Sequence, residues 1–133
     1  SSKKVPAVAG TIQVTPSKKV YNAGETVEIR VTGKGLQSVN ALSFALPYDP
    51  QVMEYAGVDA AGMKEMKNLT YDRLHSNGVK ALYPTFVNLG EKPTLEGDGE
   101  LMVIKFKAKT RLTFKLKAID GILVDKYLNT IHW

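Results

Sequence analysis

The chain has 133 residues, of which 44% are hydrophobic and 23% charged, with a formal net charge of +5 and no cysteine. This length and composition fit one globular domain whose core is large enough to fold without disulfides or a structural metal. The lack of cysteine excludes thiol catalysis, thiolate zinc sites and thiol redox chemistry. No apolar stretch approaches the roughly 20 residues that cross a bilayer, so we expect no membrane insertion.

The N-terminus is typical of a linker. It opens with the polar run Ser1-Ser2-Lys3-Lys4, which shows no periodicity. We therefore expect residues 1–8 to be a flexible linker and residues 9–133 to form the domain. We also expect the chain to be an excised piece of a longer protein and to be a monomer when alone.

Apolar and polar residues then alternate with a period of two along most of the chain, a pattern typical of strands. In chain order, the alternation predicts strands at 11–15, 25–32, 38–48, 51–57, 79–88, 101–109 and 112–118, and one or two more between 119 and 131. Residues 59–68 lack this alternation and are predicted to be irregular or briefly helical.

Glycine-containing sequences separate these segments: Asn22-Ala23-Gly24, Gly33-Lys34-Gly35, Asn77-Gly78, Asp98-Gly99 and Asp120-Gly121. Each predicts a turn, because Gly accepts a positive φ and Asn or Asp tolerates it. About nine short strands with this spacing predict an all-β fold, a nine-stranded β-sandwich with jelly-roll topology.

Neither histidine suggests catalysis. His75 lies beside a predicted turn and His132 near the C-terminus, and neither stands in a Ser or Asp motif that would orient a catalytic base. The acidic run Glu96-Gly97-Asp98-Gly99-Glu100 offers oxygen ligands but lacks the ligand ladder of a calcium loop. Solvated carboxylates of a hairpin loop are the better interpretation, so we expect no catalytic residues and no metal site.

The densest basic cluster follows two predicted strands and consists of Lys105, Lys107, Lys109, Arg111, Lys115 and Lys117. Alternate lysines commonly mark the solvent side of strands. Nucleic-acid binding would need aromatic residues on the same face, whereas Phe106 and Phe114 fall on the apolar side. We expect no nucleic-acid partner. An acidic protein surface fits better, because complementary charge speeds encounter.

Two further patterns concern binding surfaces. A sugar-binding face needs exposed aromatic platforms, but the single Trp, Trp133, is the last residue and the six Tyr are scattered. In the predicted strand 38–48, Ala41, Ser43 and Ala45 occupy the side opposite the large apolar residues. Small residues there either form a flat surface that another protein can approach closely, or mean that both faces of the strand are buried.

The segment Leu42-Ser43-Phe44-Ala45-Leu46-Pro47-Tyr48-Asp49-Pro50, followed by Val52, resembles the third strand and Tyr-Asp-Pro motif of cohesins. Gly24-Glu25-Thr26-Val27 resembles the glycine turn into the family's second strand, residues 99–108 its seventh strand, and residues 120–125 its closing strands. The resemblance covers about residues 9 to 131. Residues 63–88 are most similar to cohesin-like modules of secreted clostridial glycoside hydrolases.

The resemblance implies a sheet of strand order 8-3-6-5 that docks a dockerin, a helical module loaded with calcium. Calcium is therefore expected in the partner, with no cofactor in this chain. Carried onto this sequence, the outward side of the sheet would hold Ala41, Ser43 and Ala45 from strand 3, Tyr83, Thr85 and Val87 from strand 6, Leu74 from strand 5, and Lys115 and Lys117 from strand 8. Tyr83 is the expected main anchor.

The implied function is a non-catalytic, secreted module that docks the dockerin of another secreted glycosidase and so assembles carbohydrate-active enzymes. Cellulosomal cohesins carry polar interface residues on the third strand where this chain has small ones, so their dockerin specificity is not carried over. One alternative is a carbohydrate-binding module, because several of these share the sandwich fold. Another is a spacer without a ligand.

Overall fold

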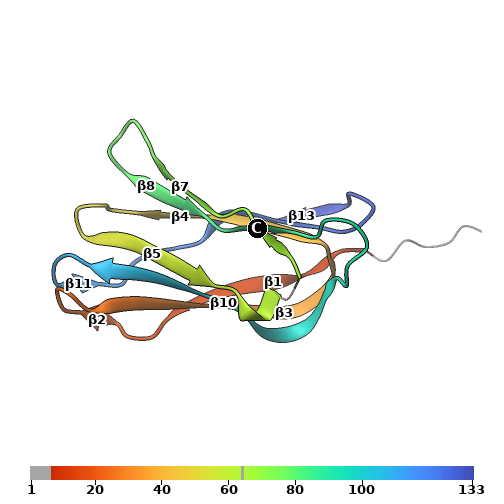
Figure 1. Ribbon diagram of the computed structural model, residues 1–133, viewed down its shortest axis with the longest axis horizontal. Coiled ribbons are helices and arrows are strands. Elements are labelled where there is room, and N and C mark those ends of the chain that lie inside the picture. The colour runs from red at the N-terminus through yellow and green to blue at the C-terminus, as the bar shows by residue number, and fades with distance from the viewer. Residues whose placement is uncertain (1–6, 64) are drawn as a thin grey trace, which may run out of the picture.

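The computed structural model describes residues 7–63 and 65–133 and shows two packed β-sheets (Figure 1). The strands are β1 (Ala9–Pro16), β2 (Val20–Tyr21), β3 (Thr26–Val39), β4 (Ala41–Tyr48), β5 (Met53–Asp59), β6 (Lys67–Asn68), β7 (Tyr71–Leu74), β8 (Lys80–Tyr83), β9 (Thr85–Val87), β10 (Leu95–Ala108), β11 (Leu112–Thr113), β12 (Ile119–Val124) and β13 (Thr130–His132). The predicted all-β sandwich is confirmed. The predicted number of nine strands is not, because the short strands β2, β6 and β11 and the break at Pro84 raise the number among the described residues.

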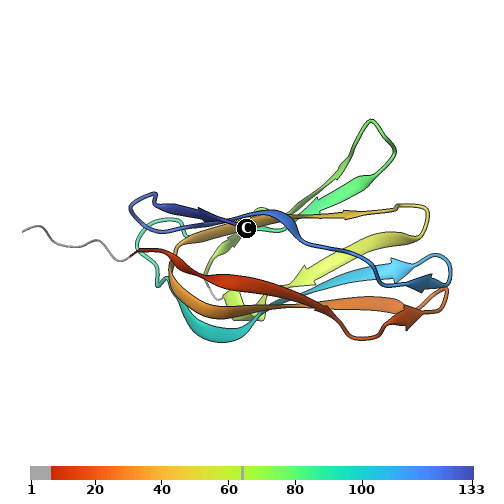
Figure 2. The same ribbon diagram turned by 180° about the vertical axis from the view of Figure 1, so that it is seen from behind.

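The two sheets have simple antiparallel orders. The first, called the β3 sheet, has the order β1-β3-β10-β5. The second, called the β4 sheet, has the order β13-β12-β4-β8-β7, with β9 beside β4 and β6 beside β9. Strands β2 and β11 form a short ribbon at one end. In both views the hairpin of β7 and β8 rises away from the rest of the sandwich (Figures 1 and 2).

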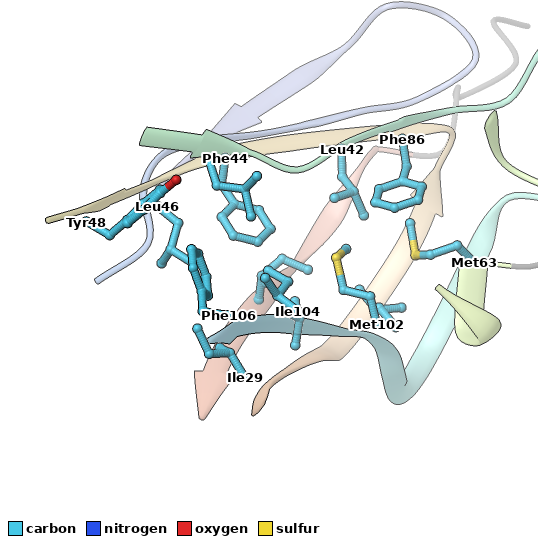
Figure 3. Close-up of a cluster of buried hydrophobic side chains, with 14 of the residues drawn as sticks. Ile29, Leu42, Phe44, Leu46, Tyr48, Met63, Phe86, Met102, Ile104 and Phe106 are labelled. Atoms are coloured by element: carbon cyan, nitrogen blue, oxygen red, sulfur yellow. The ribbon is translucent and has the colours of Figure 1, made fainter. Parts of the chain in front are cut away.

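Each sheet turns its alternating apolar residues toward the other sheet (Figure 3). The inward residues include Val27, Ile29 and Val31 of β3, Leu42, Phe44 and Leu46 of β4, and Met102, Ile104 and Phe106 of β10. The Phe106 ring meets Tyr48 edge-on with the centroids 4.7 Å apart, and it meets Tyr55 at 5.8 Å. Burial of one side leaves the opposite side of each sheet facing outward.

Three of the predicted turns lie inside strands instead. Gly33-Lys34-Gly35 lies in β3, Asp98-Gly99 in β10 and Asp120-Gly121 in β12. The pairing registers shift around them, which marks β-bulges. A positive φ serves a bulge as well as a turn, so the local sequence does not distinguish the two. The turns predicted at Asn22-Ala23-Gly24 and Asn77-Gly78 are confirmed.

The predicted strand 112–118 is wrong beyond its first residues. Strand β11 ends at Thr113, and residues 114–118 form an irregular connection that leads into β12. Phe114 and Leu116 are nevertheless half-buried against the core. The alternation of apolar and polar residues there reflects the burial of every second side chain, although the segment does not pair with a strand. The predicted strand 79–88 is interrupted at Pro84, which has no N–H to donate to a ladder.

Among its described residues, the irregular segment contains the short 3-10 helix η1 (Ala61–Met63), as the lack of alternation predicts. Residues 1–6 of the expected linker lie outside the described residues, and Val8 is buried in the core. Across 7–63 and 65–133, no helix has the length and apolar character needed to cross a membrane.

The C-terminal Trp133 packs against the core. Its ring centroid lies 5.6 Å from that of Phe44. Its backbone N–H donates to the Gly121 carbonyl at 3.0 Å, and its carbonyl accepts from the Gly121 N–H at 2.8 Å. A Cβ at Gly121 would fall inside the indole ring, so this position requires glycine. The indole is therefore not an exposed platform for a sugar.

Candidate protein-binding face

The outer faces of the two sheets differ in chemistry. On the β3 sheet, Lys105 lies opposite Glu28, and Lys107 opposite Glu54. Such cross-strand pairs of opposite charge are typical of a solvated face. The outer face of the β4 sheet carries small, aliphatic and aromatic residues instead, so it is the candidate binding face.

The candidate face is a grid of four rows, set by the registers between β12, β4, β8, β9 and their neighbours. From β12 toward β7 or β6, the rows are Val124-Ala41-Val87-Lys67, Ile122-Ser43-Thr85, Ile119-Ala45-Tyr83-Tyr71 and Pro47-Ala81-Arg73. Small residues occupy the centre, aliphatic residues one side, and aromatic and basic residues the other.

The structure brings six of the predicted partner-binding residues together on this face: Ala41, Ser43, Ala45, Tyr83, Thr85 and Val87. Ala45 is only 4% exposed, because it lies between the larger side chains of Ile119 and Tyr83. Ala41 and Ser43 are half-buried. Apart from the β7–β8 hairpin, which belongs to the same sheet, no described strand is drawn above β4 on this side in either view (Figures 1 and 2). The low exposure of Ala45 therefore comes from its neighbours within the sheet.

The polar groups at the centre of the face satisfy one another. The Ser43 and Thr85 hydroxyl oxygens lie 3.0 Å apart, and the Thr85 hydroxyl donates to the Tyr83 carbonyl at 3.1 Å. Hydroxyl groups paired in this way lose little when a partner excludes water from them. An apolar partner surface can therefore cover the centre with a small desolvation free energy.

Tyr83 stands at the aromatic side of the face in a fixed orientation. Its ring stacks on that of Tyr71, with centroids 4.7 Å apart and an interplanar angle of 14°. Its hydroxyl lies 2.9 Å from Nε2 of His75. Since the two tyrosine rings cover each other, they do not form the side-by-side platform that a sugar-binding module uses.

Three predicted residues do not join the face. Leu74 alternates with Arg73 and pairs with Lys80, which places it on the opposite side of the β7–β8 hairpin. Lys115 and Lys117 are exposed in the irregular connection 114–118. On the edge of β4 away from β8 and β9, the neighbouring strand is β12. Lys115 and Lys117 precede β12 and therefore do not lie on the sheet strand that was predicted to carry them.

The contributions of β12 and β7 to the candidate face were not predicted from the sequence. Ile119, Ile122 and Val124 form the aliphatic side of the face, while Tyr71 and Arg73 extend its other side. The bulge at Asp120-Gly121 breaks the period of two, so alternation along β12 does not show that these three residues share a side. The Tyr71 and Arg73 alternation was visible in the sequence, but the strand is only four residues long.

The β7–β8 hairpin is fixed to the sandwich from its inner side. The Tyr48 hydroxyl donates to Asp72 Oδ2 at 2.7 Å, and Lys80 Nζ lies 3.6 Å from the same oxygen. Burial and the hydrogen bond to Asp72 raise the pKa of Tyr48 far above its usual value. The phenol therefore stays protonated and remains a donor to the carboxylate.

We expect Tyr48→Phe to loosen the hairpin and lower the free energy of unfolding by about 1.5–3 kcal/mol, since a hydrogen bond to a charged group is lost. Urea denaturation measures the stability, and amide hydrogen exchange at residues 80–83 measures the loosening. Tyr127→Phe is the control, because Tyr127 is 65% exposed. Equal exchange protection in both variants would contradict this role of Tyr48.

The carboxylates of the acidic run 96–100 bind backbone N–H groups and one side chain of β3. Asp98 Oδ1 accepts from the Gly35 N–H at 2.6 Å, Glu96 Oε2 accepts from the Ser38 N–H at 3.0 Å, and Glu100 pairs with Arg30 at 3.0 Å. Asp98 and Glu96 of β10 thus accept from backbone N–H groups in the bulged part of β3. All three carboxylates border a cleft of about 390 Å³. Within the described residues, no three His, Asp or Glu side chains are close enough to hold a metal ion.

Comparison with known proteins agrees with this geometry. The family model for the cohesin domain matches residues 10–129. A cohesin module from a family 33 glycoside hydrolase of Clostridium perfringens superposes with a TM-score of 0.68 at 14% identity, covering 95% of this chain and 90% of that one. The comparison with curated proteins found no match to the chain.

Two further structures share the fold. A type II cohesin domain from the cellulosome of Acetivibrio cellulolyticus has a TM-score of 0.67 at 16% identity, covering 92% of this chain and 87% of that one. A type I cohesin–dockerin complex of Clostridium thermocellum has a TM-score of 0.60 at 18% identity, covering 83% and 79%. Since the family model spans nearly the whole sandwich, the chain belongs to the cohesin family, whose domains are non-catalytic binding modules.

Proposed function

We propose that the candidate face of the β4 sheet binds a calcium-loaded dockerin. The chain would thereby join a parent glycoside hydrolase to a second secreted enzyme. The observation that carries the proposal is the small-residue centre formed by Ala41, Ser43 and Ala45, which lie on one side of β4 in a cohesin fold. Small side chains let the backbone of a partner helix approach closely, because the distance between packed elements depends on the side chains at the contact.

The surroundings of this centre supply binding energy. Ile119, Ile122 and Val124 offer aliphatic area on one side, and Tyr83 offers an aromatic anchor on the other. A specific interface hides about 800 Å² on each partner, and a few anchors of this kind dominate its free energy. Two enzymes held together in this way act on one substrate at high effective concentration.

The test is calorimetric titration of this chain with calcium-loaded dockerins of secreted clostridial glycoside hydrolases. We expect one-to-one binding that disappears with excess chelator and returns when calcium is restored. Thermal unfolding of this chain alone should not change with chelator, which places the calcium in the dockerin.

The rival functions give different outcomes. If no dockerin produces heat but a glycan array retains the chain, the carbohydrate-binding alternative replaces the proposal. If neither assay detects binding, the chain is a spacer.

A further inference from the structure

The outer side of the β7–β8 hairpin carries a group of hydrogen-bond donors beside the small-residue centre. Arg73 lies on the outward side of β7, between Tyr71 and His75, and pairs across the strands with Ala81. Tyr83 follows Ala81 two residues later on β8, so it is the diagonal neighbour of Arg73. Diagonal neighbours in a sheet lie about 7–8 Å apart, so the two side chains can reach one shared ligand.

Arg73 has no ion-pair partner among residues 7–63 and 65–133, and its side chain is exposed. Asp72, the acidic residue of the hairpin, lies on the inner side, where Tyr48 and Lys80 neutralise it. The outward residues of β4, β7, β8 and β9 include no carboxylate. Asp120 of β12 is three strands away, about 14 Å at the usual strand spacing.

The geometry around Tyr83 holds its hydroxyl in place beside Arg73. The Tyr71 ring fixes the plane of the phenol through the stack at 4.7 Å, and His75 Nε2 fixes the hydroxyl at 2.9 Å. The Tyr48–Asp72 hydrogen bond holds the hairpin from below. With its proton on Nε2, His75 donates to the Tyr83 hydroxyl oxygen and leaves the phenol O–H free to donate. A guanidinium beside such a phenol is a donor set that suits a carboxylate, because charge-assisted hydrogen bonds are stronger than neutral ones.

We propose that Arg73 and the Tyr83 hydroxyl form a subsite for an Asp or Glu side chain of the docked partner. This inference rests on the proposed docking function and adds the chemistry of one contact to it. It moves the electrostatic contact from Lys115 and Lys117 to the hairpin. It also gives the face two chemically different ends. The β12 end makes aliphatic contacts, and Arg73 at the β7 end contacts an acidic residue of the partner.

The experiment is a charge-reversal cycle with a dockerin that binds the wild-type chain. We expect Arg73→Glu to weaken binding at least about tenfold, because truncating or reversing one member of a close charge pair is costly. Tyr83→Phe, which keeps the ring stack, and Arg73→Lys, which loses the planar fork of donors, should each weaken it less. Lys107→Glu is the matched control, because it changes the net charge equally on the outer face of the β3 sheet.

The decisive step reverses each acidic surface residue of the dockerin to lysine in turn. We expect one reversal to restore binding to Arg73→Glu while weakening binding to the wild-type chain. If Arg73→Glu binds as well as Lys107→Glu, or if no reversal restores binding, the subsite is wrong while the docking function stands. If no dockerin binds the wild-type chain, the docking function fails and the subsite fails with it.

Discussion

We expect the Ala45→Arg variant to lose dockerin binding at least about 100-fold, equivalent to ~3 kcal/mol. Ala45 lies at the centre of the candidate face, between Ile119 and Tyr83. A long side chain there rises above the small-residue centre and holds a partner helix away. If the partner still closed over it, an unpaired charge would be buried, which costs several kcal/mol.

The measurement is calorimetric titration, with circular dichroism and thermal unfolding to show that the sandwich remains folded. Gln13→Arg is the control, because it adds the same charge to an exposed position of β1 on the other sheet. Ala45 is 4% exposed, so Ser43→Arg serves as a second variant if Ala45→Arg does not fold. If a folded variant bound the dockerin with unchanged affinity, the candidate face would not be the surface that docks it.

The largest loss of stability is expected for Phe106→Ala. Phe106 is 0% exposed, and its ring meets both Tyr48 and Tyr55 edge-on. Removing a buried phenylalanine side chain costs about 3–5 kcal/mol, which combines lost transfer free energy with the cavity left behind. Because a domain of this size has about 5–15 kcal/mol of stability in total, the variant should lose a large share of it.

Urea denaturation followed by tyrosine fluorescence measures this loss. Lys105→Ala is the matched control, since Lys105 is the neighbour of Ile104 on the outward side of β10 and surface changes usually stay within about 0.5 kcal/mol. Ligand binding should not rescue Phe106→Ala beyond what mass action gives. A loss smaller than that of Lys105→Ala would mean that Phe106 does not hold Tyr48 and the hairpin above it.

The side on which each central residue lies follows from the alternation in the sequence. A strand places successive side chains on opposite faces, so once Leu42 and Phe44 are assigned to the core, Ala41, Ser43 and Ala45 must face outward. The same period predicts that Tyr83 and Thr85 share a side. The all-β class, the Asn77-Gly78 turn and the outward small residues were therefore predictable from local information.

The neighbours of those residues were not predictable in this way. Whether Asp120-Gly121 ends a strand or bulges within one depends on β4 and β13, which pair with β12 on either side. Whether Trp133 is free or packed depends on Phe44 and on the missing side chain of Gly121. The alternation of Arg73 and Leu74 gives two opposite sides, but only the pairing with β8 shows which side is outward.

Period and turn chemistry therefore specify strands and their inward sides, because these depend on the backbone of each segment alone. The composition of the candidate face depends on which strands lie side by side and in what register, which hydrogen bonds between distant segments set. For this reason the small-residue centre could be read from the chain, whereas the aliphatic edge on β12 and the Arg73–Tyr83 edge on the hairpin required the folded structure.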